Sequence, residues 1–421
     1  MMYDIAIIGG GPSGVLAGIK AASSNSKNKV IILEKNNRIG KKLSITGQGR
    51  CNITNNAPIR ETLKKYDKKE SKFIKHALYS LKNDEFLDIF RNKGLEFKME
   101  DNNRVFPVTD SAESVVSILN KYIEDLNIDL KLNHEVLNVL NDNDCFVIKT
   151  DKNEFITRKL IISTGGITYQ NTGSTGDGFR IAKKLGHSIE TIKPGLFPFI
   201  INDSNLTSLS GLSFKNIKVS FKYNNKTIEE NGDLLISNNG VTGSVIINIS
   251  RKFIKLEDYD LLENKRNFKK ETIFIDFVSQ LNREEIKDDI IKASKTNKEV
   301  HNYLRKYLPN KFTFYFLNKI GVELDIRMNN LKKTSRNKII ENLKHFPIEI
   351  DGIIDKAGFI TVGGVSLNEI NPKTMESKLI QGLYFTGELL DICGPTGGYN
   401  LQIAFTTGSL AGESASNSLN N

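Results

Sequence analysis

Short apolar runs separated by small residues fill the first forty positions of the chain. Residues 3–8 and 30–33 are continuous apolar runs, which are typical of parallel strands buried on both faces. Residues 15–22, between the two runs, are small and apolar at helical spacing. The pattern predicts a strand–helix–strand unit with a right-handed crossover.

The pattern of apolar and polar residues changes twice more along the chain. Residues 195–275 alternate apolar and polar positions, which is typical of antiparallel strands, and residues 277–345 have a helical pattern. Strand-like runs and glycines return from Gly358 and lead into a last helix near residues 400–414. We predict an α/β fold with a Rossmann-like nucleotide domain split between both chain ends. The predicted parts are residues 1–194 and 346–421 for this domain, 195–276 for an inserted β-domain and 277–345 for a helical domain.

Charge is concentrated in the predicted helical domain. The 421 residues include 59 Lys or Arg and 49 Asp or Glu, a net charge of +10, and the 39% of hydrophobic residues excludes a mainly disordered chain. Residues 277–345 contain 15 Lys or Arg against 8 Asp or Glu, so +7 of the excess lies in this one segment. The segment favours a phosphate-rich partner such as RNA, although a lysine-rich composition alone would also scatter cations over a surface.

Several classes of protein are disfavoured. Cys51, Cys145 and Cys393 are too few and too far apart for a disulfide framework. No His, Asp or Glu grouping has metal-ligand spacing, so we expect no metal. No leader-like segment precedes the first strand, and no apolar run reaches the roughly 18 residues of a membrane span. We therefore expect a soluble cytoplasmic protein that does not contact a membrane.

A glycine motif follows the first predicted strand. Gly9, Gly11 and Gly14 have the G-x-G-x-x-G spacing at the start of the first helix. This spacing allows a tight turn, close approach of a pyrophosphate and close packing of helix on strand. Glu34 ends the second strand, where a carboxylate binds a ribose hydroxyl and disfavours a 2′-phosphate. Together these features predict a dinucleotide site.

Two later segments favour FAD over NAD. Residues 160–166 are an apolar strand ending in Thr164, Gly165 and Gly166, and residues 382–388 form a similar strand that ends in Glu388, placed to reach the ribityl chain. Residues 397–402 then begin a helix whose N-terminus could face the N1–O2 edge of a flavin and stabilise negative charge on the reduced ring. The alternative is that these are only tight strand-to-helix turns.

Longer motifs extend this interpretation to a family. The segments GKKLSITGQGRCNITN (40–55), RVFPV (104–108), TGSTGDG (172–178), TMESK (374–378) and GGYNLQ (397–402) resemble those of the BaiN-like, aminoacetone-oxidase-like flavoproteins. The resemblance implies FAD, a split Rossmann-like domain, an inserted barrel-like β-domain and a small helical domain. From the motifs and the resemblance we expect cofactor contacts from Gly9, Gly11, Pro12, Ser13, Gly14, Glu34, Lys35, Lys42, Gly49, Arg50, Cys51, Asn52, Val136, Thr164, Gly165, Gly166, Gly387, Glu388, Gly398, Tyr399, Asn400 and Leu401.

Two segments depart from the family pattern. Asn238 stands where the family has a His, and Ser244 stands where it has a Pro, so a proton-transfer role for that His does not carry over. Gln170 and Asn171 replace a proline before the 172–178 segment, which could alter that loop.

Two side chains are candidates for proton transfer. Cys51 follows Arg50, which could lower the pKa of the thiol, and either Cys51 or Tyr399 could protonate a substrate carbon. The alternative for Cys51 is a small packed residue. Cys393 could lie near the ring or be incidental, and His187 is expected to be a C-cap or core residue. Only one strand–glycine–helix fingerprint is present, so we expect NAD(P)H to visit transiently as electron donor.

The resemblance leaves several functions open. The leading one is an FAD-dependent reductase of a C=C bond, with a uridine of large-subunit ribosomal RNA as the best substrate and the 277–345 segment as its RNA-binding part. The alternatives are an oxidase or dehydrogenase of a small aminoketone or steroid-like molecule, a flavin-dependent RNA methyltransferase, or a flavin-binding scaffold without turnover. Tyr303, Tyr307, Phe312, Phe314 and Tyr315 could stack on bases. Their alternative role is to form the core of the helical segment.

Overall fold

The computed structural model of the chain describes residues 2–419 except 143, 225, 264 and 355–357. The chain divides into two compact units. The first contains residues 1–194, 260–262 and 359–421, and the second contains residues 195–259 and 263–358. None of the helices in the described parts of the chain is long and apolar enough to cross a lipid bilayer.

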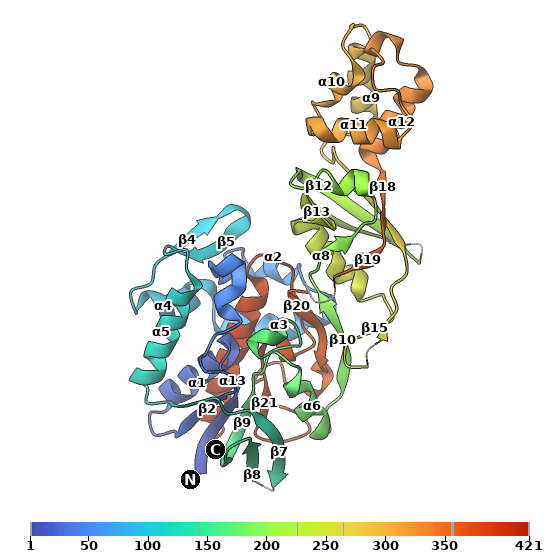
Figure 1. Cartoon of the computed structure of the whole chain (residues 1–421). Helices are drawn as coiled ribbons and strands as arrows, with labels where there is room; N and C mark the ends of the chain where they lie inside the picture. The colour runs from blue at the N-terminus through green and yellow to red at the C-terminus, as the bar shows by residue number, and fades with distance from the viewer. Residues whose placement is uncertain (1, 143, 225, 264, 355–357, 420–421) are drawn as a thin grey trace. The chain divides into compact units, whose positions relative to one another are not determined.

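The first unit is built on a seven-stranded sheet with a parallel centre (Figure 1). Its order is β6-β2-β1-β9-β8-β7, with β21 also pairing β9. β6, β2, β1, β9 and β21 run parallel, whereas β8 and β7 form an antiparallel extension. The strands are β1 (Met2–Ile8), β2 (Val30–Glu34), β6 (Asp129–Leu132), β7 (Val136–Asp142), β8 (Cys145–Thr150), β9 (Glu154–Ile162) and β21 (Leu383–Phe385).

Strand β21 shows how the second chain end completes this domain. Leu383, Tyr384 and Phe385 pair with Leu160, Ile161 and Ile162 of β9, and all six side chains are buried. A buried parallel pair needs apolar residues on both faces, which both runs supply. The split of the nucleotide domain between the two chain ends is therefore built into the central sheet.

Helices cover this sheet and flank it. The helices of the first unit are α1 (Pro12–Ser24), α2 (Ile59–Leu63), α3 (Lys68–Ser80), α4 (Asn83–Arg91), α5 (Ala112–Asp125), α6 (Asp177–Lys184) and α13 (Tyr399–Asn417). Two small sheets lie outside the main one, β3 (Thr54–Asn55), β5 (Arg104–Pro107) and β4 (Phe97–Glu100) in one, and β10 (Ile189–Gly195) with β20 (Ile360–Val365) in the other. In Figure 1, α1 and α13 run side by side in the centre of the unit.

The second unit contains a seven-stranded antiparallel sheet. Its order is β18-β17-β12-β13-β14-β11-β19. The two edge strands, β18 and β19, are separated by Asp351 alone, so the sheet must curl until its edges approach each other, as in a barrel. The strands are β11 (Phe199–Ile200), β12 (Ser213–Tyr223), β13 (Lys226–Ser237), β14 (Gly240–Thr242), β17 (Glu271–Asp276), β18 (Phe346–Ile350) and β19 (Gly352–Ile353).

The domain boundary predicted at residue 346 is wrong. Residues 346–350 pair with β17 and residues 352–353 pair with β11, so both strands complete the inserted sheet rather than the nucleotide domain. The return to the first unit comes at Phe359. The reason is that Phe346, Ile348 and Ile350 are buried at alternate positions, which fits a strand of the antiparallel sheet.

The helical segment packs onto this sheet and forms one unit with it. Its helices are α9 (Arg283–Ala293), α10 (Val300–Leu304), α11 (Asn310–Lys319) and α12 (Lys333–Lys344), while α7 (Ser204–Thr207) and α8 (Ser244–Ile254) lie in the sheet region. Phe312 of α11 lies 4.8 Å from Phe214 and 5.9 Å from Phe346, ring centroid to centroid. The predicted separate helical domain therefore shares its core with the β-domain.

The interleaved aromatics of this segment mostly serve that core. Tyr303 and Phe312 are buried. The hydroxyl groups of Tyr303 and Tyr307 both donate to Asp289, and that of Tyr315 donates to Asp203 at 2.9 Å. Phe314 is 38% exposed. The core interpretation holds for Tyr303 and Phe312, while Tyr307 and Tyr315 are half-buried with their hydroxyl groups engaged.

Candidate functional site

Three glycines shape the loop between β1 and α1, each for a different reason. Gly9 has φ +109° and a Cβ there would lie 2.5 Å from the carbonyl oxygen of Ser163, while a Cβ at Gly14 would lie 1.9 Å from the oxygen of Gly9. Those two positions must be glycine for the chain to pack on itself. A Cβ at Gly11 would meet no atom within 4 Å. The chain itself does not require glycine at position 11, so the open space beside it is where a ligand would come close to the backbone.

The N-terminus of α1 faces the same space without a side-chain cap. Gly11 is the N-cap, Pro12 is the first helical residue, and the first turn has no acidic residue. The free N–H groups and the helix dipole favour an anion at this end. The Oγ of Ser13 is buried and has no hydrogen-bond partner among the described residues. A pyrophosphate would satisfy these donors, and its predicted contacts with Gly11, Pro12 and Ser13 stay predictions.

Glu34 closes the other side of the loop. Its Oε2 accepts from the N–H of Gly10 at 2.7 Å, and its Oε1 accepts from the N–H and the amide of Asn36 at 2.8 and 2.7 Å. The residue is 8% exposed. A carboxylate has lone pairs for about four donors, so three protein donors leave capacity for one hydroxyl group.

An open cavity lies beyond Glu34 at the carboxyl end of β2. Its volume is about 420 Å³. Lys35, in its wall, donates to Thr175 at 2.6 Å and pairs with Asp177 at 2.5 Å, and burial lowers the pKa of Lys35. The N–H of His134 donates to the Glu34 carbonyl at 3.0 Å and holds the two segments together. The predicted contact Val136 follows Glu135 of the wall and begins β7. The lining residues are Lys35, Asn36, Asn133, Glu135, Asp151, Lys152, Gln170, Asn171, Gly173 and Thr175.

Helix α13 packs against α1 backbone to backbone. A Cβ at Gly408 would lie 2.1 Å from the carbonyl oxygen of Ser13, and a Cβ at Gly412 would lie 2.1 Å from that of Ala17. From the first contact to the second, the residue number rises by four in both helices, so the two helices run parallel. At roughly 1.5 Å per residue, α13 extends about 12 Å beyond the N-terminus of α1. The unit thus presents two uncapped helix N-termini on one side, offset along their common direction.

The loop after β2 holds the N-terminus of α13. Gly398 has φ +95°, and a Cβ there would lie 2.3 Å from the carbonyl oxygen of Thr54. The amide of Asn55 donates to the carbonyl of Gly397 at 2.9 Å. The side-chain oxygen of Asn52 accepts from the N–H of Gly398 at 3.1 Å, in the amide orientation that also lets its nitrogen donate to backbone carbonyls. Asn400 accepts from the N–H of Gly394 at 2.7 Å and donates back to its carbonyl at 3.0 Å. The structure therefore brings the predicted residues Asn52, Gly398 and Asn400 together.

Two residues in this region were not predicted. Asn83 donates to the carbonyl of Asn55 at 2.7 Å and accepts from the amide of Gln402. Gln402 is 3% exposed and lies in the first turn of α13. The pair joins segments 319 positions apart in the chain. Nothing local in the sequence marks Asn83 as a partner of this helix.

A half-buried charge network connects the predicted residues Lys42, Gly166 and Glu388. Lys42 contacts Glu388 at 2.8 Å and Thr168 at 2.9 Å. The other oxygen of Glu388 accepts from the N–H and hydroxyl of Thr361 at 2.8 and 2.9 Å. A Cβ at Gly166 would lie 1.9 Å from that hydroxyl, so glycine is required there. Thr361 was not predicted; the signal that could have found it is the pair Gly363-Gly364 after its apolar run.

The remaining predicted glycines and small residues lie around the same loops. Gly165 has φ +73° and Gly387 has φ +68°, and Gly387 lies against Ser13. The Oγ1 of Thr164 is buried without a hydrogen-bond partner among the described residues. Gly49 has φ +84° and is half-buried, and Leu401 is half-buried in the first turn of α13. Contact of these residues with a cofactor stays a prediction.

The predicted role of Cys51 is wrong. Cys51 has no exposed surface, and burial raises the pKa of its thiol to about 12. Arg50 does not lower it, because the guanidinium pairs with Glu100 and with Asp110 and stacks 4.2 Å above the ring of Phe106. A thiol with no exposed surface does not reach a flavin or a substrate in this structure, so the structure supports neither the predicted cofactor contact nor the predicted proton transfer. Cys51 is the packed residue of the alternative interpretation.

Tyr399 remains a candidate proton donor. It is 7% exposed at the start of α13, and burial raises the pKa of its hydroxyl, which therefore stays protonated at neutral pH. The hydroxyl of Tyr66 donates to the Tyr399 carbonyl at 3.2 Å and fixes its backbone. Cys393, by contrast, is 1% exposed and incidental to this surface.

The structure also places His187, Asn238 and Ser244, which were named from the sequence. His187 is a core residue, with Nε2 2.7 Å from the Ser377 hydroxyl. Asn238 is exposed in the turn between β13 and β14, and the hydroxyl of Ser244 accepts from the N–H of Asp233 at 3.0 Å. No group of three His, Cys, Asp or Glu side chains that could hold a metal ion occurs in the described parts of the chain.

Comparison with known proteins defines the class of this molecule. The family model described as the HI0933-like protein Rossmann domain matches residues 3–414. The chain therefore belongs to the HI0933-like family, and it is an FAD-dependent oxidoreductase. The predicted family resemblance and fold class are confirmed.

Relatives within and beyond the family have several activities. The chain is 30% identical to the 3-dehydro-bile acid delta(4,6)-reductase of Clostridium scindens, over 98% of this chain and 99% of that protein. It is 26% identical to the ribosomal RNA dihydrouridine synthase of Escherichia coli, over 96% of both chains. The 3-ketosteroid delta1-dehydrogenase structure of Sterolibacterium denitrificans shares the fold, with a TM-score of 0.52 and 12% identity over 99% of this chain and 100% of that one.

The residues of the first unit fit FAD. The open backbone at Gly11 and the unsatisfied Oγ of Ser13 suit its pyrophosphate, and Glu34 suits its adenosine ribose. Bound here, FAD would supply a ring that exchanges a hydride with a substrate. The chain's own part is to bind the phosphates at α1 and to place the N-terminus of α13, with its positive dipole end, about 12 Å further along.

Proposed function

We propose that this enzyme reduces a carbon–carbon double bond conjugated to a carbonyl group, and that its substrate is a uridine of large-subunit ribosomal RNA, which becomes dihydrouridine. The reaction adds two electrons and two protons across C5 and C6 of the base. NAD(P)H is proposed as the electron donor. One proton must come from an acid near the substrate, and Tyr399 is the candidate for that role.

The observation that carries the RNA substrate is the distribution of charge. Residues 277–345 hold 15 Lys or Arg against 8 Asp or Glu. Among the residues of the described part of this segment, ten of the cations have no ion-pair partner within 4 Å, namely Lys292, Lys295, Lys298, Arg305, Lys311, Arg327, Lys332, Lys333, Arg336 and Lys338. RNA binding depends on a surface of unpaired cations that neutralise phosphates, whereas reduction of a small molecule does not require such a surface.

The second candidate is a small-molecule reductase. Its support is the bile acid reductase, which is the relative with 30% identity, against 26% for the Escherichia coli RNA enzyme. Both activities would use one kind of chemistry on a conjugated carbonyl. The oxidoreductase class sets aside the RNA methyltransferase alternative.

The donor is proposed to visit the substrate side transiently. The Gly173–Gly178 segment follows a 3₁₀ turn at Gln170–Thr172 rather than a strand, so it does not form a second nucleotide-binding motif of the strand–glycine–helix kind. Such an arrangement predicts ping-pong kinetics, in which NAD(P)⁺ leaves before the substrate binds.

The experiment supplies the purified holoprotein, under nitrogen, with NADH or NADPH and one of two substrates. The first is large-subunit ribosomal RNA from a strain that lacks the gene, and the second is a steroid with a 3-oxo-4,6-diene. The proposal expects one new dihydrouridine per RNA by mass spectrometry and slow turnover of the steroid. Rapid steroid reduction with unchanged RNA would establish the second candidate instead.

A further inference from the structure

We propose that the cavity at the start of α10 is a docking site for the phosphodiester backbone of RNA. Eight residues line this cavity, which is open to solvent and has a volume of about 640 Å³: Asn297, Lys298, Glu299, Asn302, Tyr303, Arg305, Lys306 and Arg327. The inference rests on the proposed function and names the part of the basic segment that engages the RNA substrate.

A backbone bridge fixes the floor of the cavity. Glu299 and Arg327 pair as an antiparallel bridge, and two further bonds lock the flanking residues. The N–H of Val300 donates to the Ile326 carbonyl at 2.9 Å, and that of Met328 donates to the Lys298 carbonyl at 2.8 Å. Val300 and Met328 are also buried. Lys298 and Arg327 thus come from two chain segments held side by side by backbone hydrogen bonds, so their places in the wall do not depend on a flexible loop.

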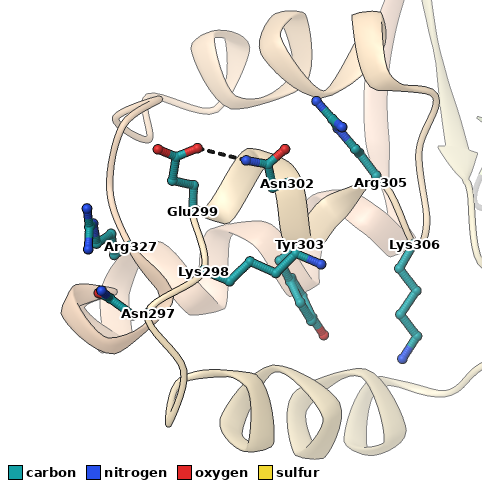
Figure 2. A pocket seen from close by; sticks show the side chains of 8 residues that line it. All are labelled: Asn297, Lys298, Glu299, Asn302, Tyr303, Arg305, Lys306 and Arg327. Atoms are coloured by element: carbon teal, nitrogen blue, oxygen red, sulfur yellow. Dashed lines mark hydrogen bonds between the residues drawn. The ribbon is translucent and has the colours of Figure 1, made fainter.

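The lining is strongly cationic. Its charged side chains are four cations and one carboxylate. Figure 2 shows the four cations Lys298, Arg305, Lys306 and Arg327 among the lining residues, with Glu299 turned toward Asn302. Lys298, Arg305 and Arg327 are exposed and have no ion-pair partner within 4 Å among the residues the structure describes, whereas Lys306 pairs with Asp289 at 2.6 Å. Three cations are therefore available to phosphates.

The one carboxylate of the lining is already engaged. The amide of Asn302 donates to Glu299 at 2.7 Å, and the imidazole of His301 lies 3.5 Å from the same oxygen. These contacts hold the carboxylate on the protein side, so it opposes an incoming anion less than a free side chain would. The amides of Asn297 and Asn302 add uncharged donors suited to phosphate and ribose oxygens.

The lining also indicates how RNA would be recognised. Tyr303 is the one aromatic residue of the wall, it is buried, and its hydroxyl donates to Asp289. The wall therefore offers cations and amides to a backbone but no exposed ring to a base. Binding at this site should depend on charge and salt, with little dependence on RNA sequence.

The test compares two triple variants of the full-length holoprotein. One is Lys298→Gln, Arg305→Gln, Arg327→Gln, and its control is Lys332→Gln, Lys333→Gln, Lys338→Gln, which removes the same charge from exposed positions of α12 and its N-cap. Binding of a labelled single-stranded RNA of about 20 nucleotides, in two unrelated sequences, is measured by fluorescence anisotropy from 50 to 200 mM salt. Circular dichroism and an unfolding midpoint close to that of the wild type verify that each variant is folded.

The cavity variant is expected to bind both RNAs at least about tenfold more weakly at low salt. The slope of its log affinity against log salt concentration should be smaller in magnitude by about 2, which is the value for three lost phosphate contacts on a single strand. The control should stay within about twofold. Equal loss in both variants, or unchanged binding in the cavity variant, would overturn the proposal. So would polyglutamate that competes as well as polyuridine at equal charge, because the partner would then be an acidic protein. Binding is read without turnover, so failure of uridine reduction alone would count against the proposed function and not against this site.

Discussion

The backbone oxygen of Ser13 would lie 2.1 Å from any Cβ at position 408, so the close packing of α1 on α13 depends on Gly408. Because Gly412 has the same relation to Ala17, the two helices are parallel over at least one turn. This contact fixes the offset between the N-terminus that suits a pyrophosphate and the one that suits the flavin ring. The geometry of the site therefore depends on Gly408 and Gly412, which sequence analysis did not single out.

Replacing Gly408 with Ala should destabilise the folded protein. The added methyl group must push the helices apart, and overpacking of this kind typically costs about 1–3 kcal/mol. Urea unfolding of the apoprotein measures the loss of free energy of unfolding. A variant as stable as the wild type would mean that the two helices do not approach this closely.

Replacing Gly11 with Ala should separate cofactor binding from folding. Gly11 has φ −79° and ψ 179°, which alanine adopts readily, and its Cβ would face open space. We expect the apoprotein to unfold within about 0.5 kcal/mol of the wild type, as for a neutral surface change. The same variant should retain much less FAD after dialysis, measured by absorbance at the flavin band. Undiminished FAD retention would contradict the placement of the pyrophosphate.

Replacing Cys51 with Ala should leave catalysis intact. The thiol is buried and neutral at physiological pH, and it has no access to a substrate. We expect kcat/KM within a few-fold of the wild type and the same pH profile. The control is Tyr399→Phe, which removes the remaining candidate acid and should lower the rate of substrate reduction but not that of flavin reduction by NAD(P)H. A loss of two orders of magnitude in Cys51→Ala would restore the thiol as a catalytic residue.

Acid should weaken the fold in part through His187. Burial lowers the pKa of this imidazole below its usual value, so the folded state binds its proton less readily than the unfolded state. The contribution of His187 to the free energy of unfolding is complete above the pKa of histidine in the unfolded chain, near 6.5. It is lost as the pH falls through the lower pKa of the folded state, by at most about 1.4 kcal/mol per pH unit. The slope of unfolding free energy against pH should be shallower in His187→Gln and unchanged in His76→Gln, whose side chain is exposed. Equal slopes in all three proteins would contradict this assignment.

The sequence predicted the parts of the site that are local. The strand, glycine turn and helix at residues 3–22, with Glu34 behind them, follow from spacing that a reader can count. The joining of Asn83 to Gln402 could not be predicted, because it links two segments far apart in the chain through side chains common on any surface. The burial of Cys51 was equally invisible, since its neighbours Arg50 and Asn52 are polar and suggest an accessible loop.

The boundary at residue 346 shows a different limit. Phe346, Ile348 and Ile350 do alternate as a strand should, but alternation does not say which sheet a strand joins. That choice depends on pairing with Glu271–Asp276, which is a tertiary relation.

The most direct test of uridine reduction is made in cells. Large-subunit ribosomal RNA from a strain without the gene is compared by mass spectrometry with RNA from its parent, from a strain complemented with the wild-type gene and from one complemented with Gly11→Ala. The proposal predicts that one dihydrouridine is lost in the deletion strain and returns with the wild-type gene. With Gly11→Ala, a smaller fraction of the RNA should carry it. Identical dihydrouridine content in the deletion strain and its parent would contradict it.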